Sequence, residues 1–462
     1  MIDLGRAVEA RVEPSAAWLR RHAKVLVAGA VLLAVAIVVC LLVGLSPWLP
    51  PVLVLLAFVA LRPLPGLGYA IVVLSVPLGL WAIGVEDVVG SAFGGRDYML
   101  NISAVAVVFL HVARTAVGWR PSRAQAIAAG VAAAVLAVSA LIGFAHHGVP
   151  QTLIGVRYVV FPVVFLAAVV ARPARDIARL VGLFAWVMVA NALAAVGEFI
   201  VGPARLAAWG LDNGNAIRYI NGNFRAPGLT DFNAELGMLA GAFLLGYLGL
   251  WLTRGSRPRR WSWHAGAVAA ALCLALSTSR SGAVLLVAGL VVAVVLNRSG
   301  GAAARRRSRL LGLAVLAAVA VGFVAVGATG GSSLLQRLDV WGSLLRGHVP
   351  AYGLGVGAVG AASNSRVAAG SQVFVDNYVI SVALQFGPVV AAVLVVLIVA
   401  ALVRLCRRSV DRPTYVLYIA VVAGLAASFL LIESWEYDSA MACLAVFVAH
   451  GLRDAPENAP YG

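Results

Sequence analysis

Long apolar stretches separated by short polar connectors dominate the chain. Runs such as 25–43, 102–117, 310–326 and 389–403 carry almost no charge. Apolar runs of about 17 to 25 residues are long enough to cross a hydrocarbon core of about 30 Å. The pattern predicts an all-α, polytopic membrane helical bundle with about 14 (12–14) transmembrane helices, forming a single integral membrane domain over 1–462. The expected spans are 24–43, 46–61, 67–84, 99–117, 124–143, 153–171, 178–201, 231–252, 262–277, 281–297, 309–327, 377–403, 414–432 and 438–451.

Two connectors are longer than the others, and both fall on the external side of this topology. The loop at 202–230 is rich in Asn and Gly, and the loop at 328–376 has a Gly-rich middle. Loops longer than about 15 residues are usually either functional or disordered. The second loop contains Trp341, Tyr352 and Phe374 but little Pro or Lys, which favours an ordered segment that covers a site.

The composition agrees with the membrane class, and the charge distribution gives an orientation. Hydrophobic residues make up 62% of the chain and charged residues only 12%, against about 25% charged in soluble domains. The net charge of +16 could indicate nucleic-acid binding. However, 26 of the 35 Lys and Arg residues fall on one side of the predicted topology. The positive-inside rule makes that side cytoplasmic, so both termini are expected in the cytoplasm and no nucleic-acid partner is expected.

The remaining compositional signals concern cofactors and source. Cys40, Cys273, Cys406 and Cys443 are scattered in or beside apolar spans and form neither a CxxC pair nor a zinc-ligand spacing with His. We therefore expect no metal and no cofactor. Arg outnumbers Lys 34 to 1 beside abundant Ala, Val and Gly, a bias that suggests a GC-rich bacterial genome and hence the bacterial cytoplasmic membrane.

Charged residues at the outer ends of spans are the candidates for function, because charge at a hydrocarbon layer is costly. Arg280 lies in a polar break between two spans, with hydroxyls at Ser279 and Ser281. A guanidinium presents a planar fork matched to phosphate oxygens, which favours an anion site. The alternative is a turn residue that extends to the lipid head groups.

Two further external arginines have similar alternatives. Arg157 at the outer end of its span could bind phosphate or extend to the head groups. Arg225 precedes a helix that is expected to start near Thr230 or Asp231, so it could hold an anion at a helix N-terminus, although its Pro-Gly neighbours also mark an ordinary turn.

The external carboxylates also have two interpretations each. Asp376 could be a general base or could cap the next helix. Glu198 and Glu235 could each pair with an Arg, the acidic turn 433–438 could hold sugar or be merely solvated, and Glu86-Asp87 forms an acidic pair in an earlier external loop.

Four motifs between 225 and 387 resemble the O-antigen ligase and O-antigen polymerase superfamily of envelope glycan-assembly enzymes. They are the Ser-Arg-Ser-Gly break at 279–282, the loop segment from Trp341 through Gly357, the Asp376-Asn377 pair followed by Gly387, and, more loosely, Arg-Ala-Pro-Gly at 225–228. Ligases of this family carry a His where this chain has Asp376, and His348 lies far from that position. An acidic residue there is more similar to the polymerase or exopolysaccharide branch.

The resemblance implies transfer of a glycan from a polyprenyl-pyrophosphate-linked donor to an acceptor sugar hydroxyl of a glycan or lipid, on the outer face of the membrane. It implies catalytic roles for Asp376, Arg280 and Arg225, with no metal and with inversion of the anomeric configuration. The expected substrate-binding residues are Arg157, Ser279, Ser281, Asn377, Tyr352 and Trp341.

Two other functions remain open from the sequence. A metal-dependent glycosyltransferase with a polyprenyl-monophosphate donor would use an early acidic pair, for which Glu86-Asp87 could serve. A lipid-linked glycan flippase or other transporter would place its charged groups near the middle of the membrane.

Overall fold

The structure is a computed structural model of the 462-residue chain. It describes residues 31–43, 45–92, 99–116, 122–209, 219–220, 223–254, 260–296, 339–344, 346, 357–361, 375–408 and 415–452. The predicted span at 309–327 and the candidate Tyr352 lie outside these residues.

The described residues are mainly helical, which confirms the predicted class. The exception in regular structure is one antiparallel pair of two-residue strands, β1 (Tyr219–Ile220) and β2 (Asn223–Phe224). A helix over Val31–Leu42 precedes the labelled elements. The helices are α2 (Leu49–Leu61), α3 (Pro63–Ser75), α4 (Pro77–Ala82), α5 (Val85–Ala92), α6 (Met99–Ala116), α7 (Arg123–Val170), α8 (Ala174–Val201), α9 (Pro203–Ala208), α10 (Asn233–Arg254), α11 (Trp261–Ser277), α12 (Arg280–Leu296), α16 (Tyr378–Phe386), α17 (Pro388–Arg408), α18 (Tyr415–Ser428), the 3-10 turn η3 (Ser434–Glu436) and α19 (Asp438–Leu452).

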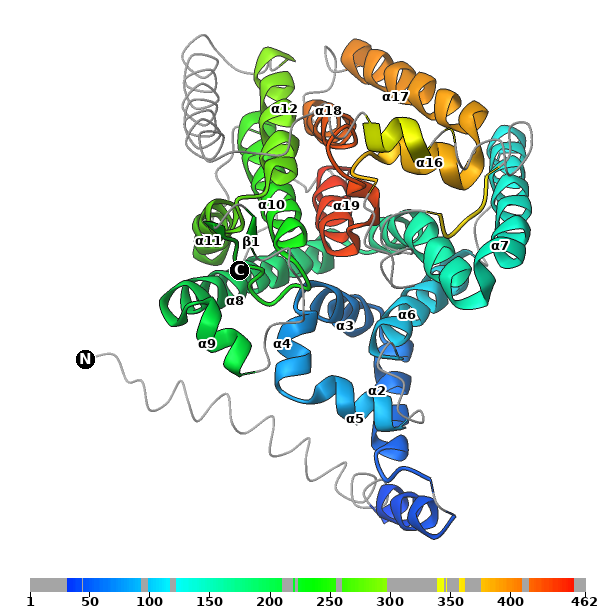
Figure 1. The fold of residues 1–462 in the computed structure, drawn as a ribbon, viewed down its shortest axis with the longest axis vertical. Coiled ribbons are helices and arrows are strands. Elements are labelled where there is room, and N and C mark those ends of the chain that lie inside the picture. Colours follow the sequence, from blue (N-terminus) through cyan, green and yellow to red (C-terminus); the bar gives the residue numbers. More distant parts are fainter. Residues whose placement is uncertain are drawn as a thin grey trace.

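Helix α10 forms the centre of the bundle, since it packs against α8, α11, α12, α18 and α19 (Figure 1). Its side chains are apolar around most of the circumference, and Leu236, Met238 and Phe243 are fully buried. The Phe243 ring meets Phe447 of α19 edge to face at 5.5 Å. A helix that is apolar on all sides is expected in the core of a large protein or a membrane domain.

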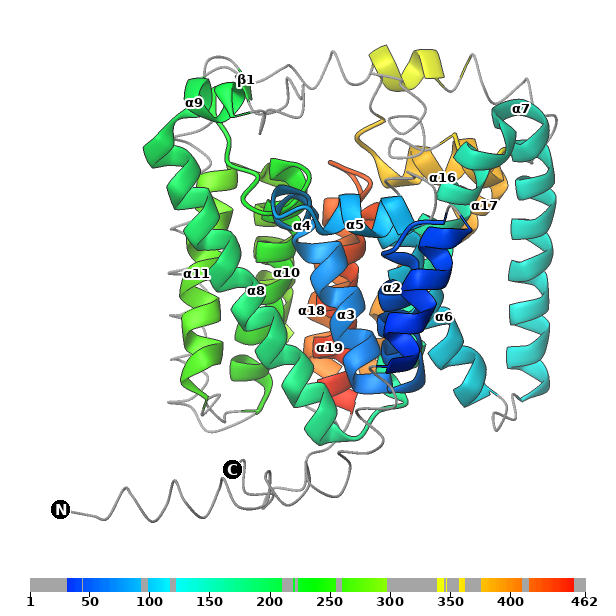
Figure 2. The same cartoon turned by 90° about the horizontal axis from the view of Figure 1, so that it is seen from below.

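The longest helices run roughly side by side along one direction (Figure 2). Helix α9, strand β1 and the short helix at 339–344 all lie beyond the same end of them. We call this end the Arg280 end, because α12 begins there with Arg280. The opposite end carries Arg172, in the turn between α7 and α8, and is called the Arg172 end.

Two helices expose apolar side chains as a lipid-facing helix does. Val389, Val396 and Leu397 of α17 are each about 60% exposed, as are Ile127 and Val131 of α7. Apolar side chains that are exposed together on a folded surface mark contact with lipid or protein. Four described helices are long and apolar enough to cross a membrane, namely α7, α8, residues 233–251 of α10 and α17, or five if the bent pair α2 and α3 forms one span. The structure therefore supports a membrane protein, and it does not confirm a count of about 14 spans.

Several predicted spans have different boundaries in the structure, and glycine or proline is the reason in each case. The predicted spans 124–143 and 153–171 correspond to two helical halves of α7, which meet at the non-helical residue Gly148 (φ 75°). The predicted span 377–403 is divided into α16 and α17 at Gly387 and Pro388, and 67–84 is divided before Pro77. Pro favours the first turn of a new helix, and Gly accepts the positive φ that ends a helix.

Candidate functional site

The loop that carries Arg225 is held from two sides by backbone hydrogen bonds. The N–H of Gly228 donates to Glu198 Oε2 of α8 at 3.0 Å, and the N–H of Leu229 donates to Asn191 Oδ1 at 3.0 Å. The N–H of Ala226 donates to the carbonyl of Leu276, near the end of α11, at 3.3 Å. The loop is therefore fixed against α8 and α11, and it places Arg225 beside the turn between α11 and α12.

The turn between α11 and α12 positions Arg280. Thr278 adopts the left-handed conformation (φ 49°) that ends α11, and Arg280 is the first residue of α12. The hydroxyls of Ser279 and Ser281 lie 3.1 Å apart and are hydrogen-bonded to each other, and Ser279 Oγ also accepts from the N–H of Gly282. Both serines are buried, so their hydroxyls stabilise the turn.

Glycines allow α10 and α12 to approach until their backbones touch. A Cβ on Gly241 would collide with the carbonyl of Gly282, and a Cβ on Gly237 would collide with the side chain of Ser279. Small residues four positions apart are the usual means by which membrane helices pack closely. This contact fixes the start of α12, and with it Arg280, against the start of α10.

Replacing Gly241 with Ala is expected to destabilise the protein by about 1–3 kcal/mol, because the added methyl group forces two backbones apart. Thermal unfolding in detergent measures the change. Gly130→Ala is the matched control, since a Cβ at Gly130 meets no atom within 4 Å. An Ala there is expected to be neutral or to stabilise α7 by up to about 1 kcal/mol. Equal effects at the two positions would contradict the proposed role of the crossing.

Arg225 and Arg280 form a pair of like charges at this end of the bundle. Burial, and secondly the charge of Arg280, lower the pKa of Arg225. The Nε of Arg225 is buried and has no hydrogen-bond partner. In the part of the chain that the structure describes, the ion pairs are Arg157–Asp438 and Arg179–Asp176, and neither includes this pair. Two adjacent guanidinium groups without a described counter-ion provide a site suited to an anion with several oxygens.

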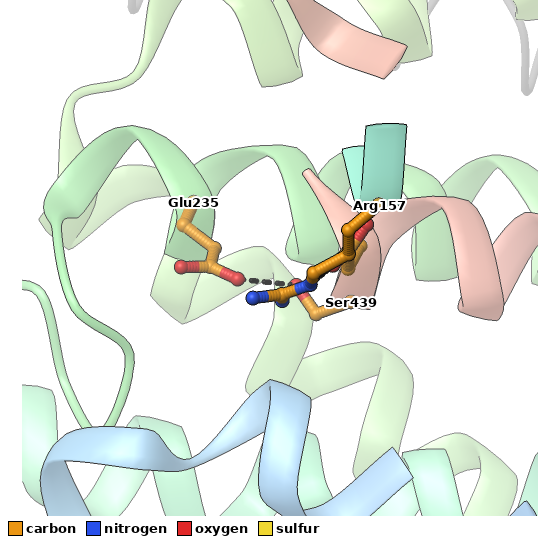
Figure 3. Close-up of polar contacts among 4 residues, drawn as sticks. Arg157, Glu235 and Ser439 are labelled. Atoms are coloured by element: carbon orange, nitrogen blue, oxygen red, sulfur yellow. Dashed lines mark hydrogen bonds and ion pairs between the residues drawn. The ribbon is translucent and has the colours of Figure 1, made fainter. Parts of the chain in front are cut away.

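Arg157 differs from this pair, because it already has a partner. Its Nε and Nη2 donate to Asp438 Oδ2 at 3.1 and 2.6 Å. The Arg157 side chain extends from α7 toward Glu235 of α10 and Ser439 of α19 (Figure 3). The hydroxyl of Ser439 donates a hydrogen bond to Glu235 Oε1 at 3.0 Å. Arg157 thus makes an ion pair that ties α7 to α19, and the phosphate-binding role expected for it stays a prediction.

Asp231 lies just before α10, within range of the charge of Arg157. It is solvent-accessible, but protein crowds it on most sides, and the resulting desolvation raises its pKa to about 6 against the opposing effect of the Arg157 charge. A carboxyl group with such a pKa exchanges its proton close to neutral pH.

Asp376 and its neighbours connect the long loop to the bundle. Asp376 is half-buried and has a positive φ of 50°. Asn377 caps α16, since its side chain accepts from the N–H of Ile380 at 3.2 Å, and the Trp341 indole N–H donates to the carbonyl of Val375. The helix-capping alternative therefore applies to Asn377 rather than to Asp376, and Trp341 fixes the segment that holds Asp376.

Tyr437 lies between Asp376 and the loop that carries Arg225 in the network of contacts. Its ring meets Phe232, at the end of that loop, at 6.3 Å in an edge-to-face contact. Burial raises the pKa of Tyr437, and the carboxylates of Glu433 and Asp376 raise it further. Asp376 is thus within electrostatic range of a ring that packs on the loop of Arg225.

Several polar residues of this region were missed or only partly assigned from the sequence. Asn191 holds the loop of Arg225, and Ser381 and Gln385 of α16 donate hydrogen bonds that connect to Glu436 Oε1. Each is an isolated polar residue within an apolar helix, and that isolation is a signal that could have found it. Glu198 accepts a hydrogen bond from the N–H of Gly228, and Glu235 accepts one from the hydroxyl of Ser439.

The acidic pair Glu86-Asp87 lies in the first turn of α5. Across the described ranges, no group of three or more His, Cys, Asp or Glu residues is arranged to hold a metal ion. In comparisons with known proteins, the chain matches no family model, no curated protein and no solved structure.

Proposed function

We propose that the protein is a membrane glycosyltransferase that polymerises or ligates glycan from a polyprenyl-pyrophosphate-linked donor. The acceptor is a sugar hydroxyl of a second glycan or of a lipid. The observation that carries the proposal is the juxtaposition of Arg225 and Arg280 with a buried, unpartnered Nε on Arg225. The sequence resemblance supplies the reaction class, and the two arginines supply the site for the pyrophosphate.

The chemical step follows from this arrangement. The acceptor oxygen attacks the anomeric carbon and forms the new glycosidic bond while the bond from that carbon to the pyrophosphate oxygen breaks. Negative charge develops on the departing lipid pyrophosphate, where Arg225 and Arg280 stabilise it. Fixed charges that face developing charge are usually the largest catalytic contribution. Asp376 accepts the proton of the acceptor hydroxyl, and attack from the opposite face inverts the anomeric configuration.

The proposal places the Arg280 end at the outer face of the bacterial cytoplasmic membrane. It includes about 14 transmembrane helices, cytoplasmic termini and a loop at 328–376 that covers the sugars. The support is the charge distribution along the chain, together with the position of α9, β1 and the 339–344 helix beyond the Arg280 end (Figure 2). A lipid-linked donor would then have its prenyl tail in the bilayer and its pyrophosphate at the arginines.

The test is to incubate the purified full-length protein with a lipid-pyrophosphate-linked glycan and to separate the products by chromatography. A ladder of lengthened products is expected from a polymerase, and a single transferred product from a ligase. The same glycan on a lipid monophosphate is the control, and it is expected to react poorly because it offers fewer oxygens to the two arginines. A chain that turns over neither substrate, while correctly folded, would contradict the proposal.

The two alternative functions predict different outcomes in this assay. A metal-dependent enzyme with a monophosphate donor would prefer the control substrate, and it would lose activity with EDTA or in Glu86→Ala. A transporter would need charged groups near the middle of the membrane, whereas the ion pair Arg157–Asp438 includes the first residue of α19. It would move lipid-linked glycan across a vesicle membrane without forming a new glycosidic bond.

A further inference from the structure

A second group of basic residues lies at the Arg172 end of the bundle, away from the site described above. Arg62 connects α2 to α3, Arg114 is in the last turn of α6, and Arg172 is in the turn between α7 and α8. His111 of α6 lies among them, since the charges of both Arg114 and Arg172 act on its ring. We call these four residues the basic cluster.

The carboxyl end of α2 orients two members of the basic cluster. The guanidinium of Arg114 donates to the carbonyl of Ala60, and His111 Nε2 lies 3.2 Å from the carbonyl of Val59. The last carbonyls of a helix have no partner within the helix and attract cations. These contacts use one guanidinium nitrogen of Arg114, so its other N–H groups remain available to a ligand.

Arg172 supplies the observation that points to a missing ligand. Its Nε is buried and has no hydrogen-bond partner. The nearest acidic residue along the chain, Asp176, is hydrogen-bonded to Arg179 at 3.4 Å. Among the residues described, neither recorded ion pair includes Arg62, Arg114 or Arg172. Because this nitrogen has no exposed surface, a ligand oxygen would meet the terminal N–H groups of the half-buried Arg172 side chain, which have no acceptor among the described residues.

The position of the basic cluster indicates what kind of ligand reaches it. Helix α8 begins at Ala174, next to Arg172, and its Glu198 binds the loop of Arg225. The 24 residues between Ala174 and Glu198 span roughly 36 Å at 1.5 Å per residue. That length is close to the thickness of a hydrocarbon core of about 30 Å. The two groups of arginines therefore lie at opposite membrane surfaces.

Apolar side chains beside the basic cluster are exposed. Leu61 of α2 is 66% exposed, and Phe109 and Leu110 of α6 are each nearly 40% exposed. A basic cluster next to exposed apolar side chains matches a phospholipid, because the phosphate would bind the arginines while the acyl chains contact the apolar side chains. Free phosphate would bind the arginines alone.

We propose that the basic cluster binds the phosphate of an anionic phospholipid in the leaflet opposite the Arg225–Arg280 site. Basic sites between transmembrane helices bind anionic head groups in this way. Arg114 and Arg172 donate to the phosphate oxygens, and the bound lipid joins α2, α6 and the turn between α7 and α8. The inference does not depend on the glycosyltransferase activity.

The experiment measures lipid binding to delipidated full-length protein by native mass spectrometry, with phosphatidylglycerol, phosphatidylcholine and inorganic phosphate as separate ligands. Phosphatidylglycerol is expected to bind more tightly than phosphatidylcholine. Arg114→Gln and Arg172→Gln are each expected to weaken phosphatidylglycerol binding about fivefold, the effect of one basic residue at a charged membrane surface. Arg407→Gln is the matched control, because Arg407 is an exposed basic residue in the last turn of α17, and α17 packs on α16 and α18.

Three outcomes would overturn the proposal. The first is equal affinity for phosphatidylglycerol and phosphatidylcholine, and the second is an equal loss in Arg407→Gln. The third is binding of inorganic phosphate as tight as that of the lipid, which would identify a soluble anion as the ligand. Thermal unfolding of each variant in the absence of lipid separates lost binding from lost folding, and Arg114→Lys is expected to retain part of the affinity because it keeps the charge.

Discussion

Arg280→Ala is expected to reduce glycan transfer by about 100- to 1000-fold, the usual effect of removing one group that stabilises developing negative charge. Arg280 begins α12 and is half-buried beside Arg225. Removing the guanidinium is expected to leave the turn folded, because the hydrogen bond between Ser279 and Gly282 that stabilises the turn does not involve it. The measurement is the initial rate of product formation by purified protein at saturating donor.

The matched control is Arg205→Ala. Arg205 is an exposed arginine of α9, beyond the same end of the bundle. This variant is expected to keep the wild-type rate within about twofold, since an exposed charge in a high-dielectric surrounding contributes little. Arg280→Lys is expected to recover only part of the activity, because an ammonium group lacks the planar fork of a guanidinium. Wild-type activity in Arg280→Ala would remove the arginine pair from the mechanism.

The double variant Arg225→Ala/Arg280→Ala tests whether the two arginines act on one anion. If both hold the same pyrophosphate, the loss in the double variant is expected to be smaller than the product of the two single losses, because groups that act as a unit are not additive. Independent sites would give losses that multiply. The cycle therefore distinguishes a shared site from two separate charges, whatever the size of each single effect.

Much of the fold could be predicted from the sequence, because the period and length of apolar runs determine where helices form. Of the candidates, Arg225 lies in the loop before α10 and Arg280 at the start of α12, and the charge of Arg280 acts on Arg225. The close crossing at Gly237, Gly241 and Gly282 was not predicted. A glycine in an apolar run shows no sign of its contact until a partner helix is placed against it.

The pairing of Arg157 with Asp438 could not be derived from the sequence for a related reason. The two residues are 281 positions apart, and each has another charged or polar candidate nearby in the chain. Which carboxylate meets which guanidinium depends on the packing of α7 against α19. Hydropathy predicts that these helices exist, but it contains no information about which helices are neighbours.

Separating Arg157 from Asp438 is expected to have the largest effect on stability. Asp438→Leu leaves an uncompensated guanidinium in a largely buried position, and loss of one partner of such a pair costs about 3–5 kcal/mol. The Asp438 side chain is only 4% exposed and that of Arg157 is 21% exposed. Asp176→Leu is the matched control, because the Asp176–Arg179 pair is more exposed, at 24% and 47%. Loss of that pair is expected to cost about 1 kcal/mol or less.

The double variant Arg157→Met/Asp438→Leu determines whether the pair is structural or catalytic. Apolar residues of similar size often replace a buried ion pair without loss of stability. We therefore expect thermal unfolding in detergent to return close to the wild-type midpoint. Because Arg157 is neutralised by Asp438, glycan transfer is expected to return with it. A double variant that is stable but inactive would contradict this and would restore Arg157 as a ligand of the substrate.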